Sequence, residues 1–325
     1  MVQYTDVLEA YNRVKDVVNK TPIMTSRTLN ELVNAEIFLK CENFQRIGAF
    51  KMRGAYNAIS QLSEKQKSRG VITHSSGNHA QAVALAAKLA GIRATIVMPK
   101  SSPQVKVNAT RDTYNANVVM CEPTIEARQK TAQELIDKHG FTLIHPYDND
   151  DVIAGAGTAA YELLNDVENL DMVFAPVGGG GLLSGTSIAV KGFDSDIKIF
   201  GVEPENVDDA YRSLKSGKIE TNKTINSIAD GLLTYLSERT FNIIEKNVDQ
   251  IITVSEQEIA DAMRFIWERM KLVVEPSGAC SLAGVLSGKI RVDNKRIGVI
   301  ISGGNIDLNE FFDLIQKKIR IKNNN

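Results

Sequence analysis

Lys51 stands in a stretch whose residue types could perform covalent chemistry. It lies between Phe50 and Met52 in the run GAFKMRGAYNAI. A lysine among apolar neighbours can lose its charge through desolvation, and its neutral amine is then a nucleophile. A surface lysine with a buried stem would give the same local pattern. Lys51 therefore indicates a Schiff-base lysine only in combination with the other parts of a site.

Three junctions between expected strands and expected helices are rich in small residues. They read SSGN at 75–78, GGGG at 178–181 and SGGN at 302–305. Each glycine costs backbone entropy on folding, and one glycine would suffice for a tight turn. Consecutive backbone N–H groups at the start of a helix converge on an anion, and glycine lets the anion approach closely. The run at 178–181 therefore predicts a phosphate cradle.

The glycine run does not match the common nucleotide motifs. No lysine follows it as a P-loop requires. Leu183 stands where the dinucleotide fingerprint has its third glycine, although Gly185 is close and Glu203 lies at the end of the next expected strand. A nucleotide-binding oxidoreductase or a non-catalytic binding protein therefore stays open. A Schiff-base lysine, a phosphate cradle and a hydroxyl at another strand end are together the parts of a pyridoxal phosphate site.

Alternating strands and helices would position these residues. Between residues 70 and 146, short apolar runs alternate with amphipathic runs of helix length, and a similar series follows. Such alternation predicts an α/β fold with parallel-rich, open, twisted sheets covered by helices. The earlier strand-like run AEIFLKCE needs a sheet to join. We predict a small domain of residues 70–146 inserted into a large, cofactor-binding domain of residues 1–69 and 147–325.

The composition excludes several other classes of protein. A net charge of −1 gives no basic surface for nucleic acid, and no apolar run is long enough to span a bilayer. The three cysteines are far apart in the chain, which argues against disulfides and a zinc site. The N-terminal run contains acids and is not a secretory signal. We expect a cytoplasmic protein that acts on small molecules.

Five motifs together resemble one enzyme family. They are AFKMRGA, SSGNHAQ, VGGGGL, ERMKLVVEPSGA and SGGN, and they extend from Lys51 to Asn305. In this combination they are similar to the serine racemase and threonine dehydratase family of fold type II (tryptophan-synthase-β-like) pyridoxal phosphate enzymes. The order of helices and strands fits this family along nearly the whole chain. The resemblance is far more specific than any single glycine loop.

The resemblance implies a cofactor-binding role for each motif. Lys51 would hold pyridoxal 5′-phosphate covalently, Asn78 would contact the oxygen on its ring, and Phe50 would pack against the ring. Ser302 would face the pyridine nitrogen, where a hydroxyl makes a weaker electron sink than a carboxylate would. The phosphate would be bound by the backbone of Gly178, Gly179, Gly180, Gly181 and Leu182.

The resemblance also implies how an amino-acid substrate binds and reacts. Ser75 and Asn78, with their loop amides, would bind the substrate carboxylate at a helix N-terminus, and Arg128 would assist. Racemisation of serine needs proton donors on both faces of Cα, and these would be Lys51 and Ser76. Threonine dehydratases commonly carry alanine at the position of Ser76, so a threonine or serine dehydratase is the alternative. A plain helix-capping role for Ser76 also stays open.

A metal ion, a nucleotide and a second subunit follow from the same resemblance. Mg²⁺ or Ca²⁺ would be bound by the carboxylates of Glu203 and Asp209 and the carbonyl of Val207, which are ligands of the type that hard cations take. Helix capping by Asp208 or Asp209 is the alternative. ATP would bind as an effector between the subunits of a homodimer. The positions that match an ATP site are Gln81, Lys271 and Asn305.

Overall fold

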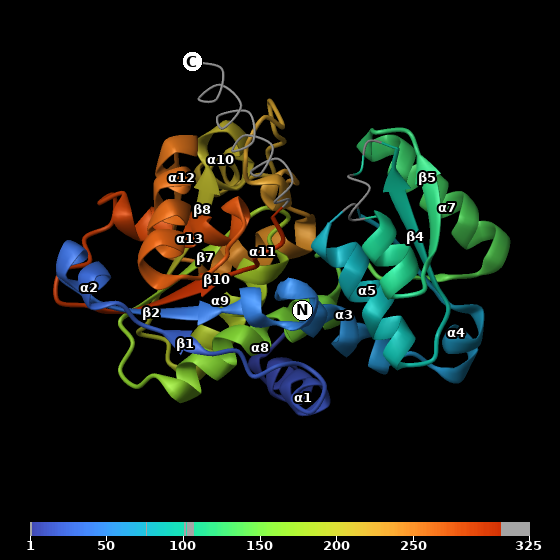
Figure 1. Cartoon of the computed structure of the whole chain (residues 1–325), viewed down its shortest axis with the longest axis horizontal. Coiled ribbons are helices and arrows are strands. Elements are labelled where there is room, and N and C mark those ends of the chain that lie inside the picture. The colour runs from blue at the N-terminus through green and yellow to red at the C-terminus, as the bar shows by residue number, and fades with distance from the viewer. Residues whose placement is uncertain (1, 76, 101, 103–106, 307–325) are drawn as a thin grey trace, which may run out of the picture.

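Two β-sheets lie at opposite ends of the long axis of the molecule (Figure 1). The structure is a computed structural model that describes residues 2–75, 77–100, 102 and 107–306. The larger sheet has the strand order β1-β2-β10-β7-β8-β9. All neighbouring pairs are parallel except the antiparallel pair β1–β2. Its strands are β1 (Ile23–Met24), β2 (Glu36–Cys41), β7 (Met172–Pro176), β8 (Lys198–Pro204), β9 (Gln250–Val254) and β10 (Arg296–Ile301).

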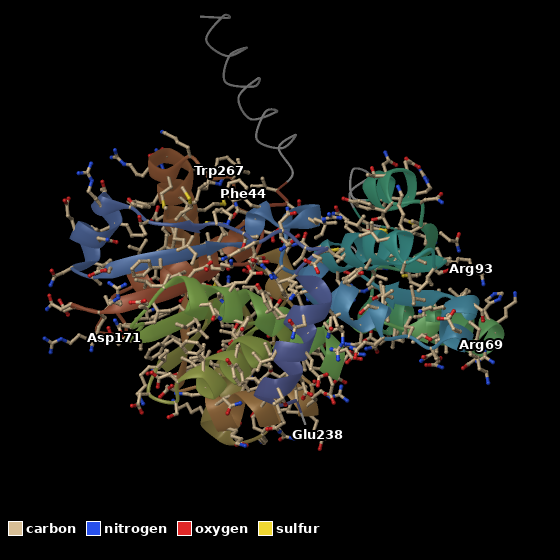
Figure 2. The ribbon with its side chains drawn as sticks, turned by 90° about the horizontal axis from the view of Figure 1, so that it is seen from below. Phe44, Arg69, Arg93, Asp171, Glu238 and Trp267 are labelled. Atoms are coloured by element: carbon tan, nitrogen blue, oxygen red, sulfur yellow. The ribbon has the colours of Figure 1, made fainter. Side chains whose placement is uncertain are left out.

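The smaller sheet is wholly parallel and has the order β5-β4-β3-β6. Its strands are β3 (Val71–His74), β4 (Ala94–Pro99), β5 (Asn117–Cys121) and β6 (Thr142–Leu143). Helix α5 (Asn78–Leu89) connects β3 to β4, and helix α7 (Ile125–His139) connects β5 to β6. A π-helical turn at Ala109–Thr113 lies between β4 and β5. Arg69 and Arg93 mark the outer end of this part of the molecule, and Asp171 marks the opposite end (Figure 2).

Helices cover both sheets, as the α/β prediction requires. The bounds of the others are α1 (Tyr4–Val14), α2 (Arg27–Val33), α3 (Lys51–Ser60), α4 (Glu64–Arg69), α8 (Asp150–Asp166), α9 (Gly181–Phe193), α10 (Asp209–Ser216), α11 (Glu238–Asn247), α12 (Glu256–Phe265) and α13 (Pro276–Leu286). Among the described residues, no helix has the length and apolar composition that a membrane span needs. All three cysteines are free and buried, which confirms their expected place in the core.

Helix α3 connects the two parts of the molecule. Its residues Met52 and Ile59 pack into the apolar core of the smaller sheet, together with Val71 of β3 and Ile96 of β4. Helix α3 also packs along α8, which covers the larger sheet. The strands that precede residue 70 and follow residue 147 all join the larger sheet. The boundaries of the two domains stay a prediction, and α3 contacts both of their cores.

A buried network of four charges fixes α3 to its neighbours. Nε of Arg53 lies 2.7 Å from Glu42, and its Nη1 lies 2.8 Å from Glu162. Nζ of Lys40 lies 2.6 Å from the other oxygen of Glu162. All four side chains are buried. Two positive and two negative groups balance, so each buried charge has a partner, as burial in an apolar interior demands. The network holds the helix that begins at Lys51.

Candidate active site

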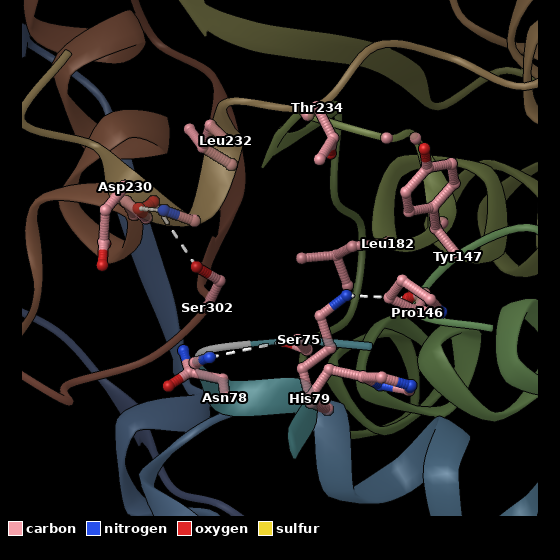
Figure 3. A pocket seen from close by; sticks show the side chains of 18 of the residues that line it. Ser75, Asn78, His79, Pro146, Tyr147, Leu182, Asp230, Leu232, Thr234 and Ser302 are labelled. Atoms are coloured by element: carbon pink, nitrogen blue, oxygen red, sulfur yellow. Dashed lines mark hydrogen bonds between the residues drawn. The ribbon is translucent and has the colours of Figure 1, made fainter. Parts of the chain in front are cut away.

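The predicted cofactor and substrate residues meet in one cavity of about 210 Å³ (Figure 3). It lies at the carboxyl ends of β3 and β7, beside the start of α3. Residues that are far apart in the chain therefore face the same space. The predicted residues that line the cavity are Phe50, Lys51, Ser75, Asn78, Arg128, Gly178, Gly179, Gly180, Gly181, Leu182 and Ser302.

Lys51 is the first residue of α3, and its amine is held inside the cavity. Nζ donates a hydrogen bond to the carbonyl oxygen of Pro146 at 2.8 Å, and it lies 5.0 Å from the centre of the Phe50 ring. Burial lowers the pKa of Lys51 to about 8, because an apolar site disfavours the charged form. A substantial fraction of the amine is therefore neutral near physiological pH and can act as a nucleophile.

The glycine run forms the turn between β7 and α9. Gly180 has a φ of +85°, a left-handed conformation that favours glycine. A Cβ atom on Gly179 would lie 2.4 Å from the ring of Tyr147, so no larger residue fits there. No side chain caps the first turn of α9 among the described residues. Its backbone N–H groups are therefore available to an anion, and the cradle fits a phosphate group.

Asn78 is held from two sides by side chains that are distant in sequence. Its Nδ2 donates to Oε1 of Glu275 at 2.8 Å, and its Oδ1 accepts from Nδ2 of Asn305 at 2.8 Å. Ser302 lines the same cavity, and its hydroxyl lies 3.4 Å from the carbonyl oxygen of Ser277. Glu275 was not predicted as a site residue, although it belongs to the motif ERMKLVVEPSGA.

Ser75 and Ser76 precede α5, and of the two only Ser75 belongs to the described residues. Ser75 lines the cavity, and its Oγ accepts a hydrogen bond from the backbone N–H of Gly77 at 3.3 Å. Ser76 lies outside the described residues. Gly77 occupies the N-cap position of α5 and no side-chain cap is made there. The amides at this helix start therefore suit the negatively charged carboxylate of an amino acid.

Three histidines near Lys51 were not predicted. His74 and His145 line the cavity with ring centres 5.7 Å apart, and Nε2 of His79 lies 2.9 Å from the carbonyl oxygen of Ile144. Burial lowers the pKa of His145 to about 4, and burial together with the charge of Lys51 lowers the pKa of His79 well below its ordinary value. These rings are therefore neutral at physiological pH. The sequence did offer one signal for two of them. His74 and His145 stand at the ends of the expected strand runs GVITHS and FTLIHP.

Arg128 brings a positive charge to the cavity. Its Nε is buried, and it has no hydrogen-bond partner among the described residues. Burial and the charge of Arg128 both lower the pKa of His74, and Arg128 opposes the rise to about 12 that burial gives the pKa of Tyr147. A guanidinium beside a substrate cavity, with its Nε lacking an acceptor among the described residues, favours an anionic group on the ligand.

The predicted metal ligands form a separate buried site at the end of β8. Oε1 and Oε2 of Glu203 accept from the backbone N–H groups of Ala210 and Tyr211 at 3.0 and 2.9 Å. Both oxygens of Asp209 are buried and without hydrogen-bond partners within the described part of the chain. Burial raises the pKa of both carboxyls, and for Glu203 the charge of Asp209 raises it further.

This arrangement fits a hard cation better than the capping alternative. Glu203 caps α10, whereas no side-chain cap is made by Asp208. Val207 is buried in the adjacent turn. Within the described residues, no group of three or more histidine, cysteine, aspartate or glutamate side chains is arranged so that it could hold a metal ion. The predicted set would therefore depend on a backbone carbonyl and water as further ligands.

The three residues predicted to contact ATP do not line the cavity. Gln81 is buried within α5. Lys271 follows a π-helical turn, and its Nζ donates to the carbonyl oxygen of Glu268 at 2.6 Å. The amide nitrogen of Asn305 donates to Asn78 and to the carbonyl oxygen of Ile47. Nucleotide binding stays a prediction.

The chain belongs to the family of pyridoxal-phosphate dependent enzymes, whose model matches residues 14–303. This confirms the resemblance, the fold class and the cofactor predicted from the motifs. The chain is 52% identical to an L-threo-3-hydroxyaspartate ammonia-lyase of Saccharomyces cerevisiae, over 97% of both chains. It is 49% identical to a serine racemase of Dictyostelium discoideum, over 97% of this chain and 98% of that one. The structure of maize serine racemase matches with a TM-score of 0.95 at 40% identity, over 99% of both chains.

Proposed function

We propose that this enzyme interconverts L-serine and D-serine and also eliminates water from serine to give pyruvate and ammonia. The observation that carries the proposal is the partly buried Lys51 amine, which shares one cavity with the glycine cradle and with Ser75, Gly77 and Asn78. Similar proteins named serine racemase support it. The alternative activity is that of a threonine or serine dehydratase, and threonine deaminase is among the similar structures.

The residues of the chain divide the work around the cofactor. When bound, pyridoxal phosphate supplies an electron sink that stabilises negative charge at Cα of the amino acid. The start of α9 holds the phosphate, and Asn78 and Ser302 orient the ring. The start of α5 orients the substrate carboxylate. Lys51, once it is a free amine, removes or returns the proton at Cα on one face.

The other face of Cα needs a second proton carrier for racemisation. We assign this role to Ser76 on the family motif SSGN, and elimination requires only the Lys51 face. Ser302 is a neutral hydroxyl, which leaves the electron sink weak and favours rapid reprotonation or departure of the β-hydroxyl. Both outcomes are therefore expected from L-serine.

The proposal is tested by following both products from L-serine. Purified enzyme with its visible cofactor absorbance should form D-serine and pyruvate in the same reaction. Pyruvate without D-serine would favour the dehydratase. If the purified protein had no visible cofactor absorbance, a nucleotide-binding or non-catalytic protein would be favoured instead.

Dehydration of 3-hydroxyaspartate is a second candidate function, favoured by Arg128. Its guanidinium has a buried Nε without an acceptor among the described residues, and a second carboxylate on the substrate would pair with it. Arg128→Met should raise KM for L-threo-3-hydroxyaspartate by about tenfold to a hundredfold, the size of a lost charged hydrogen bond. The KM for serine should change far less. The exposed Lys130→Met, on the same helix, is the control, and equal losses for both substrates would contradict this second function.

We also infer a Mg²⁺ or Ca²⁺ site at Glu203, Asp209 and the carbonyl of Val207. Two buried carboxylates beside each other repel, and either a proton on one of them or a bound cation relieves that repulsion. A cation that binds only the folded state stabilises it. Chelator should therefore lower the midpoint of thermal unfolding, and added Mg²⁺ or Ca²⁺ should restore it. In Asp209→Asn the cation should have little effect. If the midpoint does not change with chelator, after removal of the metal has been verified, the proposed cation site is contradicted.

The remaining expectations concern the setting of the enzyme. We infer a cytoplasmic homodimer without nucleic-acid or membrane partners, with ATP as an effector between the subunits. Phe44 and Val273 are large apolar side chains that are about half exposed, as a subunit interface would require. Sedimentation velocity would test the dimer, and calorimetric titration would test ATP.

A further inference from the structure

Ile47 has a backbone conformation that its side chain disfavours. Its φ is +60° and its ψ is +8°, in the left-handed region where β-branched residues are rarely found. Gly48 follows with a φ of +73°. Such strain persists only where the surrounding structure enforces it, and it is concentrated at functional sites. Ile47 stands four residues before Lys51.

Hydrogen bonds on both sides enforce this turn. Nδ2 of Asn305 donates to the carbonyl oxygen of Ile47 at 2.6 Å. The backbone N–H of Gly48 donates to the carbonyl oxygen of Gln45 at 2.8 Å, and the carbonyl oxygen of Gly48 accepts from Gly304 at 2.9 Å. A Cβ atom on Gly48 would lie 2.5 Å from Oδ1 of Asn305, so the amide packs directly against the turn.

The turn sets the path of the chain into α3. After it, Ala49 pairs with Gly303 in an isolated bridge, and the N–H of Phe50 donates to the carbonyl oxygen of Ser302 at 3.0 Å. Lys51 then begins the helix. The direction of the turn therefore decides where the Lys51 amine enters the cavity, and a displacement of about 1 Å is enough to impair a reactive group.

The side chain of Ile47 explains why glycine does not replace it. Ile47 is half-buried and packs against the apolar core of the smaller sheet, whereas its backbone is bonded to the segment that follows β10. Glycine would remove the strain but also this packing. The same amide nitrogen of Asn305 donates to Oδ1 of Asn78 at 2.8 Å, so one side chain joins the Lys51 turn to α5.

We propose that Ile47 and Asn305 act as positioning residues for Lys51. Ile47 anchors a strained turn to the core of the smaller sheet, and Asn305 locks that turn and aligns it with Asn78. The proposal rests on the proposed role of Lys51 as the residue that holds the cofactor. It makes no use of the substrate, so it is independent of whether serine or another amino acid is consumed.

A double-mutant cycle on cofactor affinity tests the lock. Asn305→Ala should weaken binding of pyridoxal phosphate to the apoenzyme by about tenfold, in line with the loss of two hydrogen bonds. In the Ile47→Gly background the same change should weaken binding by only about threefold, because a relaxed turn needs no lock and the bond from Asn305 to Asn78 is the one whose loss still matters. Equal losses in both backgrounds, or no loss in either, would overturn the proposal.

Two further variants keep the test decisive. Ile47→Asn tolerates the left-handed conformation and should reduce the effect of Asn305→Ala as Ile47→Gly does, so it replaces that background if the glycine variant does not fold. Asn43→Ala is the matched control. It removes a nearby hydrogen bond, from the side-chain amide of Asn43 to the carbonyl oxygen of Val273, and it should leave cofactor affinity unchanged. Retention of a covalent cofactor in Lys51→Ala would instead show that the role assigned to Lys51 is wrong.

Discussion

Lys51→Ala is expected to lose the covalent cofactor and to reduce turnover of every substrate by more than about 10³-fold, because one residue supplies both the attachment point and a Cα base. The folded structure should survive, since among the described residues the Lys51 side chain makes one hydrogen bond, from Nζ to the carbonyl oxygen of Pro146. The measurements are the visible absorbance after gel filtration, the rate of pyruvate and D-serine formation, and the far-ultraviolet circular dichroism.

Lys88→Ala is a suitable control for this change. Nζ of Lys88 also donates to a backbone carbonyl, that of Thr113, at 3.0 Å, but it is exposed on the outer part of α5. It should retain the covalent cofactor and full activity. A visible band that survives borohydride treatment and denaturation equally in Lys51→Ala and the unmodified enzyme would place the cofactor on another lysine.

Ser76→Ala is expected to separate the two activities. Without a proton carrier on the face opposite Lys51, formation of D-serine from L-serine should fall by about 10² to 10⁴-fold, the usual contribution of a positioned acid or base. Elimination from L-serine should persist, because Lys51 still reaches its Cα proton and the β-hydroxyl can still leave. Elimination from D-serine should collapse, because its Cα proton points to the altered face.

The ratio of D-serine to pyruvate formed from L-serine is the measurement that decides. A serine that only supports the start of the helix would lower stability by about 0.5–2 kcal/mol and change all reactions in proportion. An unchanged ratio would therefore remove the two-carrier mechanism and favour a dehydratase. Ser75→Ala is the comparison, and it should weaken binding of both enantiomers of serine.

The parts of the site that were predictable are those that lie in short, local motifs. The glycine run is recognisable from its place between a strand and a helix, and Lys51 from its apolar neighbours once the glycine run and the other motifs are considered with it. Both features are set by the backbone within a few residues. The alternation of strands and helices likewise predicted the strands of both sheets other than the two-residue strand β1, because burial imposes a regular pattern on each element.

Contacts between distant segments could not be predicted in the same way. Asn78 and Glu275 are 197 positions apart in sequence, and nothing local to either residue indicates the other. The carbonyl oxygen of Pro146 is a partner of Lys51 through its backbone, which no residue type reveals. The strain at Ile47 is equally hidden, since isoleucine gives no sign of a left-handed conformation. These features depend on how the two sheets are placed around α3.

The buried charges around Arg53 carry a consequence for how this sequence can diverge. Loss of either carboxylate leaves a guanidinium or an ammonium group buried without a partner. Such an uncompensated charge lowers the free energy of unfolding by about 3–5 kcal/mol. Replacement of all the partners by apolar groups of similar volume would carry no such penalty. We therefore expect Lys40, Glu42, Arg53 and Glu162 to be inherited as one unit, in which a change at one position requires a matching change at another. The four residues nevertheless come from four separate elements of the fold: β2, the 3-10 turn Glu42–Phe44, α3 and α8.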